Sequence, residues 1–437
     1  MIFDIVQVGD PVLRQAARPL AAAEIGTPFV QELVSLMRLT MHAPSGVGLA
    51  APQVGEGLQV VVMEDVRRLS QPQGALGSRP AVERRGGARR GGDRGARRLV
   101  AALAYHEQMS DAGSIVCGRE ITTDTILDGD LVCDRGPALV VVADGVTLDL
   151  GGHTVSGDPD GRDRGPGILL RGVTGVTVRN GTVQHFDAGV ALEGGAGNVV
   201  EGLIVQDNIG PHDGDYGDGI VVSESSNNTV RGNTVRRNGP FSGISLGRSA
   251  AGNEVAENTV TDHDMSQLGF PDAGRQTMGI RIEGPAANHN RIIGNTVTGS
   301  GCDGIVVLAA CDNPDDEPPC VGSPPNEHNE IAHNTSNSNG RSGRGCGIRL
   351  FSMPLPMPPI HNIVRDNTTD DNASYGIALD GLPLRSPGNQ ALRNRAHGNG
   401  EFDGSDGTLM PPCGKNVWAG NDFGTANQPC VERPEES

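Results

Sequence analysis

The chain of 437 residues has few aromatic side chains and no long apolar run. Aromatic residues make up 3% of the sequence, with one Trp and three Tyr. This scarcity argues against a lectin-like groove that stacks many rings on sugar faces, because such a groove needs aromatic surface. No apolar stretch approaches the roughly 18 residues needed to cross a bilayer, so we expect no membrane span.

Lysine is almost missing. Lys415 is the only one, and arginine supplies the other basic side chains. The formal net charge of -18 is unevenly spread: residues 1–113 hold 13 arginines and 11 acidic residues, whereas residues 114–437 hold 22 basic and 42 acidic residues. Because attraction to phosphate requires positive charge, we expect no nucleic-acid partner for the larger part.

Cysteine is missing from the first 116 residues, and no CxxC pair points to a zinc site. The eight cysteines that follow suggest disulfide bonds and a secreted or periplasmic protein. Proximity in the sequence predicts four pairs, Cys117–Cys133, Cys302–Cys346, Cys311–Cys320 and Cys413–Cys430. The N-terminus, however, lacks the basic and apolar regions of a signal peptide and is typical of a cytoplasmic protein.

Two recurring phrases dominate the rest of the sequence. Asn-x-aliphatic-x-x-Asn occurs six times between residues 228 and 394. Gly-aliphatic-x-aliphatic occurs eight times, with starts 22 to 43 residues apart. Its copies begin at Gly167, Gly189, Gly219, Gly243, Gly279, Gly304, Gly347 and Gly376. Because the spacing never falls below 22 residues but is sometimes much longer, each repeat is expected to form one coil, with loops of variable length added in some coils.

These phrases predict an all-β fold, a right-handed parallel β-helix. Each half-phrase suits a short strand with an aliphatic side chain at every second position. Asn and Gly tolerate the left-handed backbone that a tight corner requires. Coils stacked about 4.8 Å apart would align equivalent Asn side chains in hydrogen-bonded ladders. Stacking also buries aliphatics that a single coil cannot cover.

We expect residues 1–66 to form a separate α+β fragment. Gly46-Val-Gly-Leu-Ala-Ala-Pro-Gln53 lies between a helical pattern over 28–42 and a strand-like segment. It resembles the first motif of peptide deformylases, which implies that Gly46 and Gly48 shape the loop and that Gln53 stabilises an oxyanion. The family's Glu-Gly-Cys-Leu-Ser motif is absent, and His106-Glu-Gln-Met-Ser110 lacks a second His. We therefore expect no deformylase metal and no deformylase activity.

The two parts are joined by residues 67–113. Ten arginines and seven glycines between Arg67 and Arg98, without periodic aliphatics, predict a disordered linker. The segment Cys117–Cys133 and the following Gly145–Val155 resemble the opening coils of pectin-lyase-like and NosD-like β-helix proteins, and the resemblance extends over 114–437. It implies a polysaccharide or cell-surface glycan as partner, although a fold alone gives no activity.

Three side chains from neighbouring repeats form the first candidate catalytic site. Arg281, Asp303 and Arg349 occupy positions of the Gly-aliphatic phrase that we expect to face solvent, within about 10 Å of one another. The resemblance to sugar-acid lyases of this architecture implies an arginine base. A surface ion-pair ladder without a catalytic role is the alternative reading.

Two loops supply further candidates. His212 and Asp213 partly resemble the Asp-Pro-His-Asp signature of β-helix alginate epimerases, although a Gly/Asp-rich turn needs no function. The acidic residues between Cys311 and Cys320 predict a Ca²⁺ site, with a solvated loop as the alternative. They are Asp312, Asp315, Asp316 and Glu317. The histidines His185, His289, His328 and His361 are expected to be scattered on the surface.

The sequence therefore predicts an extracytoplasmic β-helix protein that binds or processes polysaccharide as a lyase, epimerase or hydrolase. A non-catalytic interaction solenoid and a peptide deformylase are the alternatives. We expect a monomer divided into residues 1–66, 67–113 and 114–437.

Overall fold

The computed structural model describes residues 48–63, most of 115–431 and scattered positions before residue 48. Within the larger range, the segments outside the description are 162–163, 212–214, 266–276, 310–323, 353–358, 381–387 and 409–411. The division into three parts remains a prediction.

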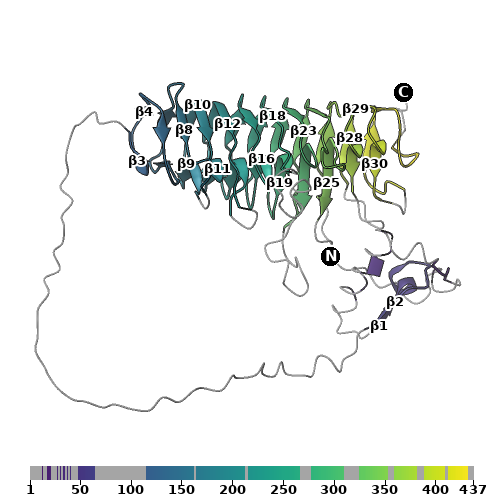
Figure 1. Ribbon diagram of the computed structural model, residues 1–437. Coiled ribbons are helices and arrows are strands. Elements are labelled where there is room, and N and C mark those ends of the chain that lie inside the picture. Colours follow the sequence, from purple (N-terminus) through teal and green to yellow (C-terminus); the bar gives the residue numbers. More distant parts are fainter. Residues whose placement is uncertain are drawn as a thin grey trace, which may run out of the picture.

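One parallel sheet of 11 strands runs along the molecule, and its colours pass steadily from blue to yellow in Figure 1. Every neighbouring pair is parallel and joins equivalent positions of consecutive coils. The strands are β3 (Arg119–Ile121), β6 (Leu139–Val141), β9 (Pro166–Arg171), β11 (Ala188–Glu193), β13 (Asp218–Ser223), β16 (Ser242–Leu246), β19 (Met278–Glu283), β22 (Ile305–Ala309), β25 (Ile348–Ser352), β27 (Tyr375–Leu379) and β30 (Phe402–Asp406). The predicted parallel β-helix is confirmed.

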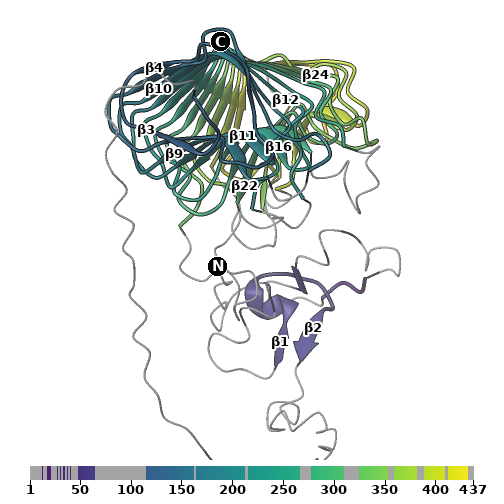
Figure 2. The same cartoon turned by 60° about the vertical axis from the view of Figure 1, so that its left-hand side comes forward.

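Two further parallel ladders complete the coils, which lie one behind another around a common interior in Figure 2. The long strands β10 (Thr177–Gln184) and β12 (Val199–Gln206) belong to both ladders. The first ladder also contains β4 (Thr125–Ile126), β7 (Thr147–Asp149), β14 (Thr229–Arg231), β17 (Glu254–Ala256), β20 (Arg291–Ile293), β23 (Glu330–Ala332), β26 (Ile363–Arg365), β28 (Gln390–Leu392) and β31 (Val417–Ala419). The second contains β5 (Leu131–Val132), β8 (Thr154–Ser156), β15 (Thr234–Arg236), β18 (Thr259–Thr261), β21 (Thr296–Thr298) and β24 (Thr335–Asn337). It continues through bridges at Thr368 to β29 (Arg395–Ala396) and β32 (Asp422–Phe423).

Buried asparagines form the predicted ladders at the corners of the coils. At Asn295, for example, the side-chain oxygen accepts hydrogen bonds from the backbone N–H (2.9 Å) and the side-chain amide (3.0 Å) of Asn258, one coil earlier. The first asparagine ladder consists of Asn198, Asn228, Asn253, Asn290, Asn329, Asn362, Asn389 and Asn416. The second asparagine ladder consists of Asn233, Asn258, Asn295, Asn334, Asn367, Asn394 and Asn421. The amides satisfy backbone groups that the turning chain would otherwise leave buried and unpaired.

Left-handed backbone at the corners is the expected reason for these asparagines, and this explanation is wrong. None of the ladder asparagines in the described coils has a positive φ. In the first asparagine ladder the residue directly before the asparagine has the left-handed backbone conformation, as at Asn227 (φ 56°) and His328 (φ 57°). The ladder position therefore selects Asn for its hydrogen bonds, and conformational freedom is needed one residue earlier.

The glycine of the second phrase is required for space. A Cβ atom on Gly189 would lie 2.4 Å from Cγ1 of Val205 and 2.7 Å from the backbone oxygen of Gly219. No real Cβ atom sits that close to a neighbour, so only glycine fits where the strand turns toward the core. The expected left-handed backbone is not found at the phrase glycines, whose φ values lie outside that region.

One continuous apolar core fills the β-helix from Ile121 to Val431. As predicted, both aliphatics of each Gly-aliphatic phrase point inward and are buried, as with Ile220 and Val222. The position between them was expected to face solvent, but Ala191 and Val306 are fully covered there. Side chains on the outer face pack against one another, so only part of this column is open to water.

The N-terminal segment has a short antiparallel pair, β1 (Gly48–Ala50) and β2 (Val61–Met63). Between them lies the 3₁₀ helix η2 (Ala51–Val54), where the side-chain oxygen of Gln53 accepts a hydrogen bond from the Ala50 N–H at 2.8 Å. The described positions at residues 30, 33, 34, 37 and 40 are α-helical, in agreement with the helical pattern. Leu33 and Met37 pack on Leu49 in a small core of their own.

Disulfide bonds join residues at both ends of the β-helix. Cys117 is bonded to Cys133 and Cys413 to Cys430, with Cα–Cα distances of 5.7 and 6.2 Å. These are two of the four predicted pairs. The described residues contain no helix long and apolar enough to cross a membrane.

Candidate functional site

Arg349 is the centre of a charged cluster on the outer face of the 11-stranded sheet. It lies on β25 between the inward-facing Ile348 and Leu350, so its side chain projects outward. Its Nη2 atom is 2.6 Å from Oδ2 of Asp380, and its Nη1 atom is 3.9 Å from Oδ2 of Asp303. The guanidinium also lies over the ring of Phe351, 4.2 Å from the ring centre, which holds it in place.

Asp303 presents a buried carboxyl group to this cluster. Its Oδ1 atom accepts a hydrogen bond from the Cys346 backbone N–H at 2.7 Å. Oδ2 is buried and has no hydrogen-bond partner among the described residues. Burial raises the pKa of Asp303 above its ordinary value of 3.8, and the positive charge of Arg349 only partly opposes this effect. Buried polar atoms are seldom left without a hydrogen-bond partner, so Oδ2 of Asp303 is a candidate for a functional role.

Cys302 and Cys346 border the same carboxyl group as free thiols. The predicted Cys302–Cys346 disulfide is therefore wrong in this structure. The strand register pairs Ile305 with Ile348, so Cys346 lies opposite Asp303 instead of Cys302, and its backbone N–H donates to the Asp303 carboxyl group. Burial raises the pKa of Cys302 to about 12 and that of Cys346 well above its ordinary value, so neither thiol is a reactive thiolate.

A second cluster of the same kind surrounds Arg281 on β19. Its Nη1 atom is 2.5 Å from Oε2 of Glu283 and its Nη2 atom 3.5 Å from Oδ1 of Asp218. Asp218 is buried and accepts a short hydrogen bond from the hydroxyl group of Ser242. Burial raises the pKa of Asp218 in spite of Arg281. Arg281 lies 5.6 Å from the ring centre of Phe241, and its Nε atom is without a partner among the described residues.

The predicted trio is thus divided between two clusters. Asp303 and Arg349 are together, but Val306 stands between Arg281 and Arg349 in the strand register. The sequence reasoning missed Asp218, Glu283 and Asp380 as members. Asp218 was visible as an acidic residue directly before the phrase glycine, the position that Asp303 also occupies. Asp380 follows β27, and nothing in its spacing indicated this role.

Several predicted sites lie outside the described residues. These are His212, Asp213 and Gly46, the Cys311–Cys320 pair, and the proposed Ca²⁺ ligands Asp312, Asp315, Asp316 and Glu317. They stay predictions.

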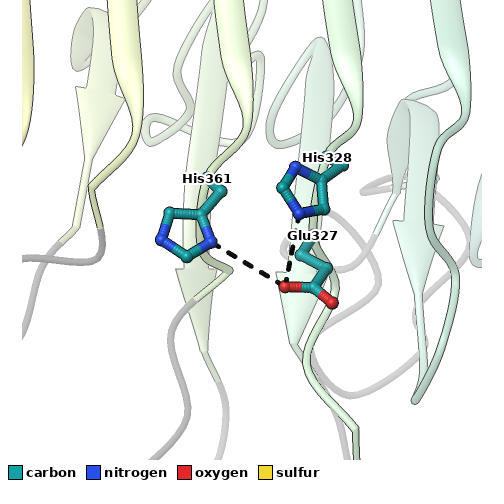
Figure 3. Close-up of side chains that lie close together, drawn as sticks. All are labelled: Glu327, His328 and His361. Atoms are coloured by element: carbon teal, nitrogen blue, oxygen red, sulfur yellow. Dashed lines mark ion pairs between the residues drawn. The ribbon is translucent and has the colours of Figure 1, made fainter.

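The histidines provide a group that the sequence reasoning did not assemble. The rings of His289, His328 and His361 form a stack, with centres 5.2 and 5.5 Å apart. Glu327 lies next to the last two, as Figure 3 shows. These three histidines are not scattered, because each directly precedes an asparagine of the first ladder in a consecutive coil. The repeated His-Asn dipeptide was the signal.

Family comparisons recognise two regions of the chain. Residues 135–297 match the family described as the right-handed β-helix region, and residues 2–79 match polypeptide deformylase. Peptide deformylase 3 of Streptomyces avermitilis is 48% identical over 75 residues, which is 17% of this chain and 33% of that protein. Peptide deformylase 1 of Streptomyces coelicolor is 56% identical over 61 residues, 14% of this chain and 28% of that protein. The chain thus spans about a third of the deformylases that it matches.

Solved structures with similar architecture include a Dettilon tailspike protein (TM-score 0.41, 15% identity, 70% of this chain and 61% of that one). An alginate lyase from Paenibacillus gives a TM-score of 0.41 at 15% identity, covering 68% of this chain and 92% of that one. The catalytic domain of an α-1,3-glucanase in complex with nigerose gives 0.43 at 14%, covering 72% and 63%.

Likeness at this level says nothing about the ligand of this chain. The continuous parallel strand register and the family match over residues 135–297 are what decide the architecture. The chain folds as a right-handed parallel β-helix, and ahead of it residues 2–79 match the polypeptide deformylase family model.

Proposed function

We propose that the outer face of the 11-stranded sheet binds a polysaccharide and that the Arg349 cluster hydrolyses it. The proposal rests on two carboxyl groups, those of Asp303 and Asp380, that both contact the guanidinium group of Arg349. One of them, Asp303, is buried with a raised pKa, whereas the side chain of Asp380 is 30% exposed. Hydrolysis of a glycosidic bond uses two carboxyl groups in different protonation states, and their environments set those states.

The separation of the two groups suits this chemistry. Both contact ends of one rigid guanidinium, at 3.9 and 2.6 Å. Their contacting oxygens therefore lie no more than roughly 9 Å apart, an upper limit that is compatible with the spacing of paired glycosidase carboxyl groups. The corresponding groups of the two clusters, Asp218 and Asp303, are three coils apart, or about 14 Å at the usual strand spacing. The catalytic pair must therefore come from within one cluster.

Asp303 is the proposed general acid, and Asp380 is the second carboxyl group of the pair. A carboxyl group with a raised pKa keeps a proton to donate to the leaving oxygen. The Oδ2 atom of Asp303 has no hydrogen-bond partner among the described residues that would compete for this contact. Arg349 contacts two carboxyl groups and stays positively charged, so it orients them and does not act as the base expected for a lyase.

The Arg281 cluster is the proposed second contact for the polymer. It places a guanidinium group beside the ring of Phe241, a combination suited to hydroxyl groups and an apolar sugar face. Since acidic residues outnumber basic ones by 20 in residues 114–437, we propose a neutral polysaccharide in preference to a polyuronate.

The first prediction tests this function with the full chain. Incubation with a panel of neutral glucans should release reducing ends without the ultraviolet absorbance of β-elimination products. Asp303→Asn should lower kcat by at least about a hundredfold, because a general acid contributes that much or more. Its matched control is Asp218→Asn, the buried carboxyl group of the Arg281 cluster, which should raise KM and keep kcat.

The outcomes separate the alternatives. If no polysaccharide is cleaved or bound, the passive interaction solenoid becomes the better description. Ultraviolet-absorbing products from polyuronates would favour a lyase and reject the assigned roles of Asp303 and Asp380.

A further inference from the structure

Histidine occupies one corner of the β-helix in three consecutive coils. His289, His328 and His361 all have left-handed backbone, with φ between 55° and 57°. They precede neighbouring members of the first asparagine ladder, so their backbone positions repeat from coil to coil. The stacked imidazole rings lie on the surface, and none of these histidines belongs to the two arginine clusters of the sheet face.

Glu327 completes a group with three potential metal-ligand atoms. Its Oε2 atom lies 3.7 Å from Nε2 of His328 and 3.8 Å from Nδ1 of His361, the two contacts drawn in Figure 3. All three ligand atoms lie within 4.8 Å of one another. Glu327 and His328 belong to one coil and His361 to the next, so a shared ligand would join two coils.

The backbone that presents these side chains is well anchored. The Glu327 N–H donates a hydrogen bond to Oδ1 of Asn288 at 2.8 Å, and residue 327 forms a parallel bridge with Ile360. The side chains themselves are partly exposed, at 31% for Glu327, 49% for His328 and 54% for His361. They can therefore rotate to contract around an ion without disturbing the core.

Two imidazoles and one carboxylate favour a transition metal over a hard cation. Ca²⁺ and Mg²⁺ select oxygen ligands, whereas Zn²⁺ accepts a His₂Glu set and keeps a fourth position for water. Tetrahedral bonds of about 2.0–2.2 Å place ligand atoms about 3.3–3.5 Å apart. The nitrogen–oxygen distances of 3.7 and 3.8 Å need to close by only a few tenths of an ångström.

We propose that Glu327, His328 and His361 form a Zn²⁺ site that clips two adjacent coils together. The carboxylate and two neutral imidazoles supply three ligands, and solvent supplies the fourth. Because only the folded coils bring these atoms together, zinc bound there stabilises the folded state against unfolding. The site is independent of the proposed polysaccharide hydrolysis.

The second prediction is tested on the metal-free full chain with Zn²⁺ alone as the probe. Calorimetric titration should show a binding event that is weakened at least about tenfold in Glu327→Gln, His328→Ala and His361→Ala, as expected when one ligand of a small site is lost. Zinc should also raise the thermal unfolding midpoint of the wild type, and these variants should lose that rise. A saturating concentration of Ca²⁺ should not displace the zinc.

His397→Ala is the matched control. His397 is also partly exposed and also faces a carboxylate, with Nε2 3.1 Å from Oδ2 of Asp422, but it belongs to no three-ligand group in the described coils. This variant should bind zinc like the wild type. Equal zinc binding by all the variants, or an equal loss in His397→Ala, would reduce the group to an ordinary histidine–carboxylate contact and overturn the proposal.

Discussion

Asp218 shows how the position of one side chain in a coil controls its chemistry. Asp218 lies directly before the glycine of its coil, in the same column as Ser242, and is only 3% exposed beside the guanidinium of Arg281. Burial disfavours the ionised carboxylate and raises its pKa, and the contact with Arg281 compensates for only part of the cost. An acidic residue directly before the phrase glycine, when buried like Asp218, therefore has a higher pKa than one at an exposed corner.

The third prediction concerns the pH dependence of stability. Above the ordinary pKa of 3.8, folded Asp218 still holds its proton while the unfolded chain has lost it. The folded state then binds more protons, so the free energy of unfolding contributed by this group falls as pH rises through the raised pKa. The stability of Asp218→Asn relative to the wild type should therefore increase with pH from 4 upward, as measured by urea unfolding.

Asp366 provides a control of opposite sign. Hydrogen bonds from Arg393, with Nε 2.8 Å from Oδ1, and from Arg365 hold the pKa of Asp366 below its ordinary value. Its contribution is present above the unfolded pKa and is lost as pH falls, so Asp366→Asn should lose relative stability as pH rises through the acidic range. Parallel pH profiles for the two variants would contradict the assigned environments.

At the scale of the element, an asparagine ladder provides hydrogen-bond partners for the backbone where each coil changes direction. Each coil changes direction at the corner and leaves backbone groups that no strand partner can reach. The amide of the next coil satisfies them, at intervals that the parallel register enforces. Loops of very different length can therefore leave the same coil without disturbing its neighbours.

The fourth prediction compares two positions of one ladder. Asn295→Ala removes the acceptor for both N–H groups of Asn258 and the donor to the backbone oxygen of Val255. It should cost at least about 3 kcal/mol of unfolding free energy, because several buried groups lose their partners. Asn421→Ala makes the same change at the partly buried end of the ladder, where water can replace the amide, and should cost about 1 kcal/mol. If both substitutions lowered the free energy of unfolding equally in urea, the contribution of a ladder asparagine would not depend on its burial.

At the scale of the molecule, the β-helix is nearly one-dimensional. Each coil contacts the coils before and after it, so the end coils have one neighbour and are the first to fray. The Cys117–Cys133 and Cys413–Cys430 bonds lie at those ends. They restrict the chain where stacking is weakest.

The fifth prediction follows from that placement. The double variant Cys413→Ser/Cys430→Ser opens a loop with a sequence separation of 17 residues and should destabilise the last coils by about 3 kcal/mol. Hydrogen exchange should become faster in β31 and β32 and stay unchanged in β17 and β20. A uniform increase along the whole β-helix would mean that its coils unfold as one unit.

Much of this architecture follows from local sequence because its repeats are short. The two phrases indicated strands, corners and stacking, and the ladders at Asn258 and Asn295 were expected from spacing alone. The inward-facing aliphatics were also predictable, since a strand alternates its faces. What spacing did not reveal was the reach of long side chains: Arg281 extends to Asp218, two coils away, instead of joining Arg349.

The sequence by itself determined a coiled, parallel β architecture and a deformylase-like beginning, because corner residues and recurring motifs act over a few positions. Only the tertiary structure decided which side chains share a site. The register between coils places Cys346 beside Asp303, brings Asp380 to Arg349 and sets His361 next to Glu327. Loops of unequal length separate these residues along the chain, and their proximity arises only when the coils stack.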